Sequence, residues 1–357
     1  MSCFRQGVLD GCALLDDHAP GSFQQGKSFL PERRAGDRTL DAALAKPLVS
    51  GFYDKPTGAI QYVVADPATK RCAIIDPILD FDERSGATAT KSADALLDFI
   101  RANGLELEWI LDTHPHADHF SAARYLHEKT GVPTAIGDRI VEVQKLWKAI
   151  YNWPDFPADG SQWDRLFGEG ETFLIGSLPV KVLLSPGHTL ASITYVIGDA
   201  AFIHDTLFMP DSGSARADFP GGSAARLWRS IQHILALPDD TRVFVGHDYQ
   251  EGGREARWES TVAEQRAKNI HLVAAHTEAE FVALREGRDK TADAAADPAC
   301  AADQHERRTA AGAGSQWKAI SEVSAGWALI ARLVPCPRHY TGRRWRQPDE
   351  GRRQRLL

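Results

Sequence analysis

The chain has 357 residues and a formal net charge of −7, from 41 basic and 48 acidic side chains. Because both signs are interspersed through the central region, the composition excludes the concentrated basic groove of a nucleic-acid-binding protein. No stretch reaches the roughly 18 apolar residues that span a membrane, and the first residues lack the apolar run of a secretion signal. The sequence therefore predicts a cytoplasmic protein without nucleic-acid or membrane partners.

The cysteine content gives no sign of a disulfide framework. Cys3, Cys12, Cys72, Cys300 and Cys336 are few, odd in number and far apart, whereas a disulfide-stabilised fold usually carries an even, closely spaced set. None lies near the polar loops described below, so we assign no catalytic thiol.

The chain is long enough for one large domain with additions at both ends. Residues 1–46 show no sustained period and indicate a flexible leader or an over-extended start, and order is expected from Pro47. Apolar runs then predict strands over 61–65 and 71–76, on either side of a turn at 66–69.

Helix and strand patterns follow in turn. Apolar residues recur at helical spacing over 92–101, and the run at 109–111 predicts a buried strand. Two more helices are expected, over 121–129, where Gly131 stops the pattern, and over 139–151.

A polar loop follows the strand at 109–111, and residues 113–119 read Thr-His-Pro-His-Ala-Asp-His. Imidazole is the commonest protein ligand of transition metals, and a turn at a strand end can point alternate side chains at two ions. A lone histidine would more often be an ordinary core or surface residue, but this density of ligand-type side chains indicates a metal site. The candidates are His114, His116, Asp118 and His119.

Three more ligand-type side chains each follow a predicted apolar strand, where a rigid scaffold commonly carries active-site loops. Taken singly, each could be an ordinary hydrogen-bonded polar residue, but together with the loop at 113–119 they indicate a complete metal site. These residues are His188 after the strand 182–184, Asp205 after 200–204 and His247 after 243–246.

This order of ligands resembles the metallo-β-lactamase superfamily, whose pattern is H-x-H-x-D-H, then a distant His, an Asp and a final His. The match runs from about residue 52 to about residue 284, and we expect residues 47–289 to form the catalytic domain. The resemblance implies an α+β fold, a four-layer αββα sandwich with the site at one edge. It also implies a first metal position at His114, His116 and His188, a second at Asp118, His119 and His247, and a bridging Asp205.

Three segments are similar to the persulfide dioxygenase branch, the relatives of the ethylmalonic encephalopathy protein. They are 211–222, which contains Gly-Ser-Ala-Arg-Ala-Asp-Phe, 247–249, which reads His-Asp-Tyr, and 259–265, which reads Glu-Ser-Thr-Val-Ala-Glu-Gln. The run 204–211 resembles most closely the bacterial β-lactamase-hydrolase-like proteins, a group linked to sulfide detoxification.

For this branch the resemblance implies one Fe(II) held by His114, His188 and Asp205, a two-imidazole, one-carboxylate set of the kind found in non-haem iron oxygenases. The other candidates would then surround the iron or remain unoccupied ligands. Catalytic roles are expected for the three iron ligands and for Asp118, and His204 is expected to contact the site from behind.

Arg216 and Tyr249 match positions on the glutathione-binding side of the branch. A guanidinium and a phenol suit a tripeptide with two carboxylates, because guanidinium pairs with carboxylate in a planar fork. The alternative is that Arg216 forms a structural salt bridge with Asp218.

The resemblance implies a dioxygenase that oxidises glutathione persulfide with O2 to sulfite and glutathione. One alternative is a hydrolase of acyl-glutathione thioesters similar to glyoxalase II, with one or two Zn(II). That enzyme's helical C-terminal domain would have to follow about residue 250, where the sequence predicts one helix, 260–285. A second alternative is a non-catalytic sulfide-sensing module, and the sequence leaves the oligomeric state open, a homodimer included.

Residues 290–357 form an atypical tail that is rich in Ala and contains ten arginines. One interpretation is a disordered basic arm that binds nucleic acid or an acidic partner. The interpretation that we favour is a frameshift, because codons permissible for residues 292–322, read one nucleotide later, can yield a Leu-Pro-rich segment resembling the end of this family's domain. Resequencing the gene distinguishes the two.

Overall fold

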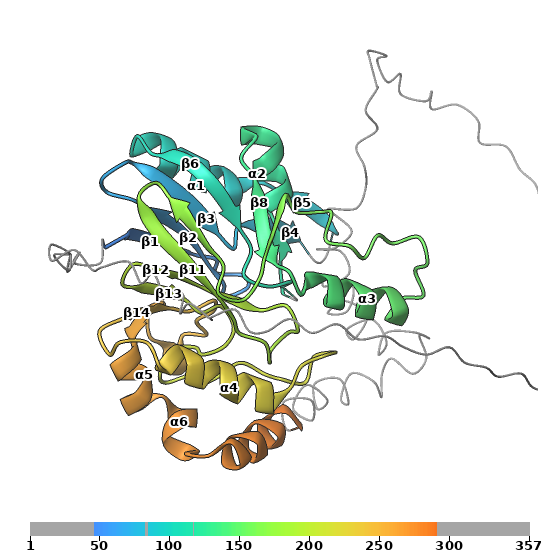
Figure 1. Ribbon diagram of the computed structural model, residues 1–357, viewed down its shortest axis with the longest axis vertical. Helices are drawn as coiled ribbons and strands as arrows, with labels where there is room; N and C mark the ends of the chain where they lie inside the picture. Colours follow the sequence, from blue (N-terminus) through green and yellow to red (C-terminus); the bar gives the residue numbers. More distant parts are fainter. Residues whose placement is uncertain (1–45, 83–84, 117, 291–357) are drawn as a thin grey trace, which may run out of the picture. The chain divides into compact units, whose positions relative to one another are not determined.

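The computed structural model describes residues 46–82, 85–116 and 118–290 (Figure 1). The expected leader and the arginine-containing tail therefore lie outside the described residues, except for one residue at each boundary. None of the helices within the described ranges is long and apolar enough to cross a membrane. Of the five cysteines, Cys72 lies in the described part, where it is buried and carries a free thiol.

The first half of the domain forms a six-stranded sheet. Its order is β1-β2-β3-β6-β8-β9, with antiparallel pairs from β1 to β3 and parallel pairs from β3 to β9. The strands are β1 (Leu48–Tyr53), β2 (Ile60–Ala65), β3 (Arg71–Ile75), β6 (Glu106–Leu111), β8 (Thr134–Gly137) and β9 (Arg165–Phe167).

Both faces of this sheet are buried, because alternate side chains of a strand point to opposite faces. On β2, Tyr62 and Val64 join the core between the two sheets. Val63 and Ala65 join a separate cluster with the apolar faces of helices α1 (Lys91–Ala102) and α2 (Ala123–Thr130). Residues 62–65 are therefore all apolar rather than alternating, because both faces of the strand are buried in apolar clusters.

The second half forms another six-stranded sheet, in the order β10-β11-β12-β13-β14-β15, and helix α4 (Ala224–Leu235) packs its apolar side against the main core. A small third sheet pairs β5 (Ala87–Ala89), β4 (Ile78–Asp82) and β7 (Phe120–Ser121). The strands of the second large sheet are β10 (Thr172–Ile175), β11 (Leu178–Leu184), β12 (Ile193–Ile197), β13 (Ala200–Phe202), β14 (Arg242–Phe244) and β15 (Glu259–Thr261).

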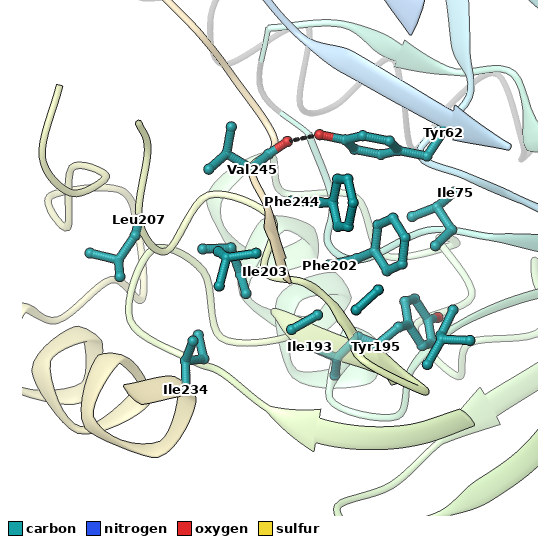
Figure 2. Close-up of a cluster of buried hydrophobic side chains, with 14 of the residues drawn as sticks. Tyr62, Ile75, Ile193, Tyr195, Phe202, Ile203, Leu207, Ile234, Phe244 and Val245 are labelled. Atoms are coloured by element: carbon teal, nitrogen blue, oxygen red, sulfur yellow. Dashed lines mark hydrogen bonds between the residues drawn. The ribbon is translucent and has the colours of Figure 1, made fainter. Parts of the chain in front are cut away.

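The two large sheets face each other across an apolar core (Figure 2). The rings of Phe202 and Phe244 stack with centroids 5.0 Å apart, and Tyr62 of the first sheet lies edge-on to both. The Tyr62 hydroxyl donates a 2.5 Å hydrogen bond to the carbonyl of Val245, which ties the first sheet to the chain that leaves β14. With α1 and α2 over one sheet and α4 against the other, the expected αββα sandwich is confirmed.

The helices expected before residue 160 are confirmed. They appear as α1, α2 and α3 (Ile140–Ile150), each within two residues of the expected bounds. Gly131 ends α2 with a left-handed conformation, φ 72°, which glycine adopts without steric cost.

The prediction of a single helix over 260–285 is wrong. Asn269 leaves the helical conformation at φ −63° and ψ 120°, and its side chain accepts a hydrogen bond from the backbone N–H of His271. The chain is extended again at Ala275, after which Thr277 and Glu280 cap each other's backbone N–H groups and restart the helix. Capping side chains thus interrupt an apolar pattern that would otherwise be continuous. The resulting segments are α5 (Val262–Lys268), α6 (Ile270–Ala274) and a helical segment over 278–290.

Candidate metal centre

The ligand candidates meet at one edge of the sandwich because of strand direction. β13 and β14 are parallel, and β11 runs in the same direction because it is antiparallel to β12, which is antiparallel to β13. Their carboxyl ends therefore share an edge, where His188, Asp205 and His247 follow them. β13 and β14 end two residues before the expected limits, so Ile203–Asp205 and Val245–His247 leave the sheet as loops. The loop after β6 supplies the ligands from the first sheet.

The two-histidine, one-carboxylate set assembles around Asp205. His114 Nε2 lies 3.9 Å and His188 Nε2 lies 3.7 Å from Asp205 Oδ2. The three ligand atoms lie within 4.8 Å of one another, and all three residues are buried. This spacing allows one ion to contact the three side chains together.

Contacts behind the imidazoles leave the inward nitrogens available. His188 Nδ1 donates to the carbonyl of Arg216 at 2.9 Å. The Thr113 hydroxyl donates to Asp76 at 2.7 Å, so its oxygen accepts from His114 Nδ1 at 2.9 Å. A hydrogen bond to one ring nitrogen sets the tautomer that frees the other for a metal.

A second group of possible ligands consists of His116, Asp118 and His119. Asp118 Oδ2 lies 3.0 Å from His119 Nδ1 and 2.7 Å from His247 Nε2. The other ring nitrogen of His247 lies 2.7 Å from Asp205 Oδ1. His247 therefore bridges the carboxylates of the two groups, and all seven expected ligands gather in one region.

The donor atoms fit a metal ion. Within the described residues, five buried side-chain nitrogens have no hydrogen-bond partner, and three are His114 Nε2, His116 Nδ1 and His119 Nε2. An unsatisfied buried polar group costs roughly 1–3 kcal/mol, so three in adjacent rings form an unfavourable cluster unless a cation contacts them. Imidazole and carboxylate donors suit both iron and zinc.

Burial and neighbouring charges hold the first set in the protonation states that ligands require. Burial, together with the nearby His116, His204 and His188, holds the pKa of His114 well below its ordinary value. Burial would raise the pKa of Asp205, but the charge and hydrogen bond of His247 outweigh it and lower this pKa to about 2. The histidine is thus neutral and the carboxyl ionised at neutral pH.

Two residues outside the expected ligand set support the site. Asp76 accepts from both the backbone N–H and the hydroxyl of Thr113 and lies 3.2 Å from His116 Nε2. Its signal in the sequence is a carboxylate directly after the apolar strand 71–75. His204 stands in the left-handed region at φ 45°, and its ring lies 5.3 Å from that of His114. It therefore occupies the expected position behind the ligands.

The side chains of Tyr249 and Arg216 lie near two of the ligand histidines. Tyr249 contacts His247 directly, and Arg216 is separated from the His188 ring by Phe219. The Tyr249 ring stacks on His247 with centroids 5.9 Å apart, and more than half of this residue is exposed. The Arg216 guanidinium lies 5.0 Å from the ring of Phe219, which itself lies edge-on to His188. Arg216 also forms two 2.6 Å hydrogen bonds to Asp218, so the salt bridge considered as the alternative is present.

Known proteins similar to this chain carry several different names. It is 66% identical over 289 residues to the beta-lactamase hydrolase-like protein of Xylella fastidiosa (strain 9a5c), covering 80% of this chain and 65% of that protein. It is 46% identical over 249 residues to Glyoxylase B2 of Dictyostelium discoideum, covering 69% and 85%. It is 28% identical over 234 residues to the mitochondrial persulfide dioxygenase ETHE1 of Mus musculus, covering 65% and 78%.

Among solved structures, ETHE1 from Myxococcus xanthus matches with a TM-score of 0.53 and 28% identity, over 67% of this chain and 90% of that one. The chain spans about two thirds of the length of the Xylella protein. The family model described as the metallo-beta-lactamase superfamily matches residues 58–247, which include every expected metal ligand. Together with the αββα fold and the His/Asp clusters, this match shows that the chain belongs to the metallo-beta-lactamase superfamily.

Proposed function

We propose that this protein is a non-haem Fe(II) dioxygenase that oxidises glutathione persulfide to sulfite and glutathione. The observation that carries the proposal is the grouping of His114, His188 and Asp205 within 4.8 Å. Burial lowers the pKa of both imidazoles, and the pKa of the Asp205 carboxyl is also lowered, so the set offers two neutral nitrogens and one carboxylate. Fe(II) held by such a set would supply the chemistry of non-haem iron oxygenases. The likeness to a mouse protein named persulfide dioxygenase supports the substrate.

The reaction balances with water as the second co-reactant. The terminal sulfur of the persulfide receives both atoms of O2, and water then cleaves the sulfur–sulfur bond to release sulfite and glutathione. The two sulfur atoms together give up four electrons, which reduce the O2. Fe(II) held by the three ligands would supply the redox chemistry, while the protein supplies binding and orientation.

The chain's own residues would orient the ligands and the substrate. His247 holds Asp205 through its Oδ1 atom, which leaves Oδ2 directed at the two histidines. Tyr249 offers an exposed phenol next to His247. Arg216 lies beyond Phe219 on the His188 side, where a substrate carboxylate would share the guanidinium with Asp218 or displace it. The burial of His114 and His188 keeps bulk water from the ligand atoms.

Oxygen consumption by the Fe(II)-reconstituted protein, measured on addition of glutathione persulfide with sulfite as product, tests this proposal. We expect stoichiometric uptake in the native protein and none in His114→Ala. His233→Ala is the matched control, because His233 is exposed on α4 and should leave uptake unchanged. A soluble, iron-loaded protein that consumes no oxygen would refute the dioxygenase.

The second candidate function is zinc-dependent hydrolysis of an acyl-glutathione thioester. It is favoured by the additional group of His116, Asp118 and His119, which could hold a second ion and so activate a bridging water. The 46% identity to a protein named Glyoxylase B2 points the same way. Thioester hydrolysis by the Zn(II)-loaded protein, without oxygen uptake by the iron form, would favour this candidate.

A further inference from the structure

The loop at residues 213–217 determines how His188 is held. Its Arg216 carbonyl accepts the hydrogen bond from His188 Nδ1 at 2.9 Å. This bond sets the direction of the ring and leaves Nε2 facing Asp205 at 3.7 Å. Because the acceptor is a backbone atom, the position of the ligand depends on the path of the loop and not on the identity of residue 216.

Side chains from residues 269–289, far along the chain, bind the backbone of this loop on both sides of Arg216. Asn269 Nδ2 donates to the carbonyl of Gly213 at 2.9 Å, and the N–H of Ser214 donates to His271 Nδ1 at 2.8 Å. Arg285 Nη1 donates to the carbonyl of Ser214 at 3.0 Å. The N–H of Ala217 donates to Asp289 Oδ2 at 3.2 Å.

Arg285 and Asp289 are the charged residues of this contact, and both are buried. They pair at 2.7 Å, and the side chain of each is 7% exposed. A buried ion pair contributes little net stability unless its remaining donors and acceptors find partners. Here the loop backbone supplies an acceptor for Arg285 and a donor for Asp289. The pair therefore binds the backbone of Ser214, two residues before Arg216, and of Ala217, the residue directly after it.

We propose that Arg285 and Asp289 are positioning residues for the metal ligand His188, acting through the backbone of residues 214–217. The inference rests on the proposed function only in taking His188 as a metal ligand. It assigns the helical segment 278–290 a part in metal binding although no residue of that segment belongs to the ligand clusters. Loss of either side chain removes a bond to the backbone next to Arg216, so the Arg216 carbonyl can shift and the imidazole of His188 is held less firmly.

Cobalt binding by the full chain tests the proposal, with Co(II) as a spectroscopic probe of the site. We expect Asp289→Ala and Arg285→Met to weaken Co(II) affinity by about 10-fold or more, as changes behind a ligand histidine commonly do. In the metal-free variants, long-range ¹H–¹⁵N spectra should show His188 as a mixture of tautomers instead of the Nδ1–H form. Asp289→Asn keeps one acceptor oxygen, so its Co(II) affinity should lie between those of the native protein and Asp289→Ala. It replaces the alanine variant in the test if that variant does not fold.

Glu278→Gln is the matched control. Glu278 lies on the same helical segment, but it is half-buried at the surface, where it pairs with Arg229 of α4 and not with the 213–217 loop. It should keep native cobalt affinity and the native His188 tautomer. Folded Arg285 and Asp289 variants with native Co(II) affinity and the native His188 tautomer would overturn the positioning role. If His188→Ala then still loses cobalt, His188 remains a metal ligand and the proposed function is unaffected. If His188→Ala also binds cobalt with native affinity, both the positioning role and the proposed function are refuted.

Discussion

At the scale of single residues, the site depends on how closely Asp205 is confined. Its Oδ1 atom is fixed by His247, and Gly246 lies directly against it. A Cβ atom built on Gly246 would stand 2.5 Å from Asp205 Oδ1 and 3.1 Å from the backbone of His204. Glycine is therefore required here by close approach and not by backbone conformation.

The change Gly246→Ala should displace the Asp205 carboxylate and lower Co(II) affinity by about 10-fold. It should also lower the free energy of unfolding by about 1–3 kcal/mol, because the added methyl overpacks a filled space. Competition with a chromophoric chelator measures the first effect and urea unfolding the second. Gly287→Ala is the control, since a Cβ there meets nothing within 4 Å. Equal affinities in the two variants would show that Asp205 tolerates the displacement.

At the scale of elements, the short helix α6 acts through its side chains. His271 is buried, and its Nδ1 atom accepts from the backbone N–H of Ser214 while the Gly213 backbone packs against the ring. Burial, followed by the charges of Arg288 and Arg285, lowers the pKa of His271 to about 4. The folded protein therefore requires this imidazole in its neutral form.

This requirement predicts a loss of stability on acidification. Unfolded chains take up a proton at His271 near pH 6.5, whereas the folded state resists it down to about 4. The contribution of neutral His271 to the free energy of unfolding is therefore complete above pH 6.5 and is lost as the pH falls from 6.5 towards 4. Urea unfolding at pH 7 and pH 5 should show a larger fall for the native protein than for His271→Asn, which keeps an acceptor but no titratable group. Equal decreases in the free energy of unfolding of the two proteins would contradict the assignment of this pH dependence to His271.

At the scale of the whole molecule, the metal site joins the two halves of the sandwich. His114 follows β6 of the first sheet, while His188 and Asp205 follow β11 and β13 of the second. An ion held by all three links loops from both sheets, in addition to the Tyr62 hydrogen bond to Val245. Metal binding should therefore stabilise the sandwich as a unit.

Removing the metal should lower the melting temperature. A ligand at 100 times its Kd stabilises the folded state by about 2.7 kcal/mol, and thermal unfolding with Co(II) and then with excess chelator measures the difference. The His114→Ala variant, which lacks a ligand from the first sheet, should show a much smaller shift. An unchanged melting temperature in the native protein would mean that the ion does not link the sheets.

The local sequence determined the parts of this protein that depend on neighbouring residues. The density of ligands at 113–119 and the polar residues after apolar strands located all seven ligand candidates, and helical periodicity located α1, α2 and α3. Short-range sterics and alternation govern such features. The break in the helix expected over 260–285 was harder to predict from the sequence, because capping by Asn269 and Thr277 competes with a strong apolar pattern.

Only the tertiary structure decided which atoms the ligands face. Long-range contacts set these orientations: His188 bonds to the Arg216 carbonyl, Asp76 supports Thr113, and Arg285 and Asp289 bind the 213–217 loop. These bonds join residues 28 to 72 positions apart. No local pattern encodes them, because they arise when strand ends and a distant helix are packed against one edge. The sequence therefore determined which side chains could bind a metal, and the packing of the two halves decided how each is oriented.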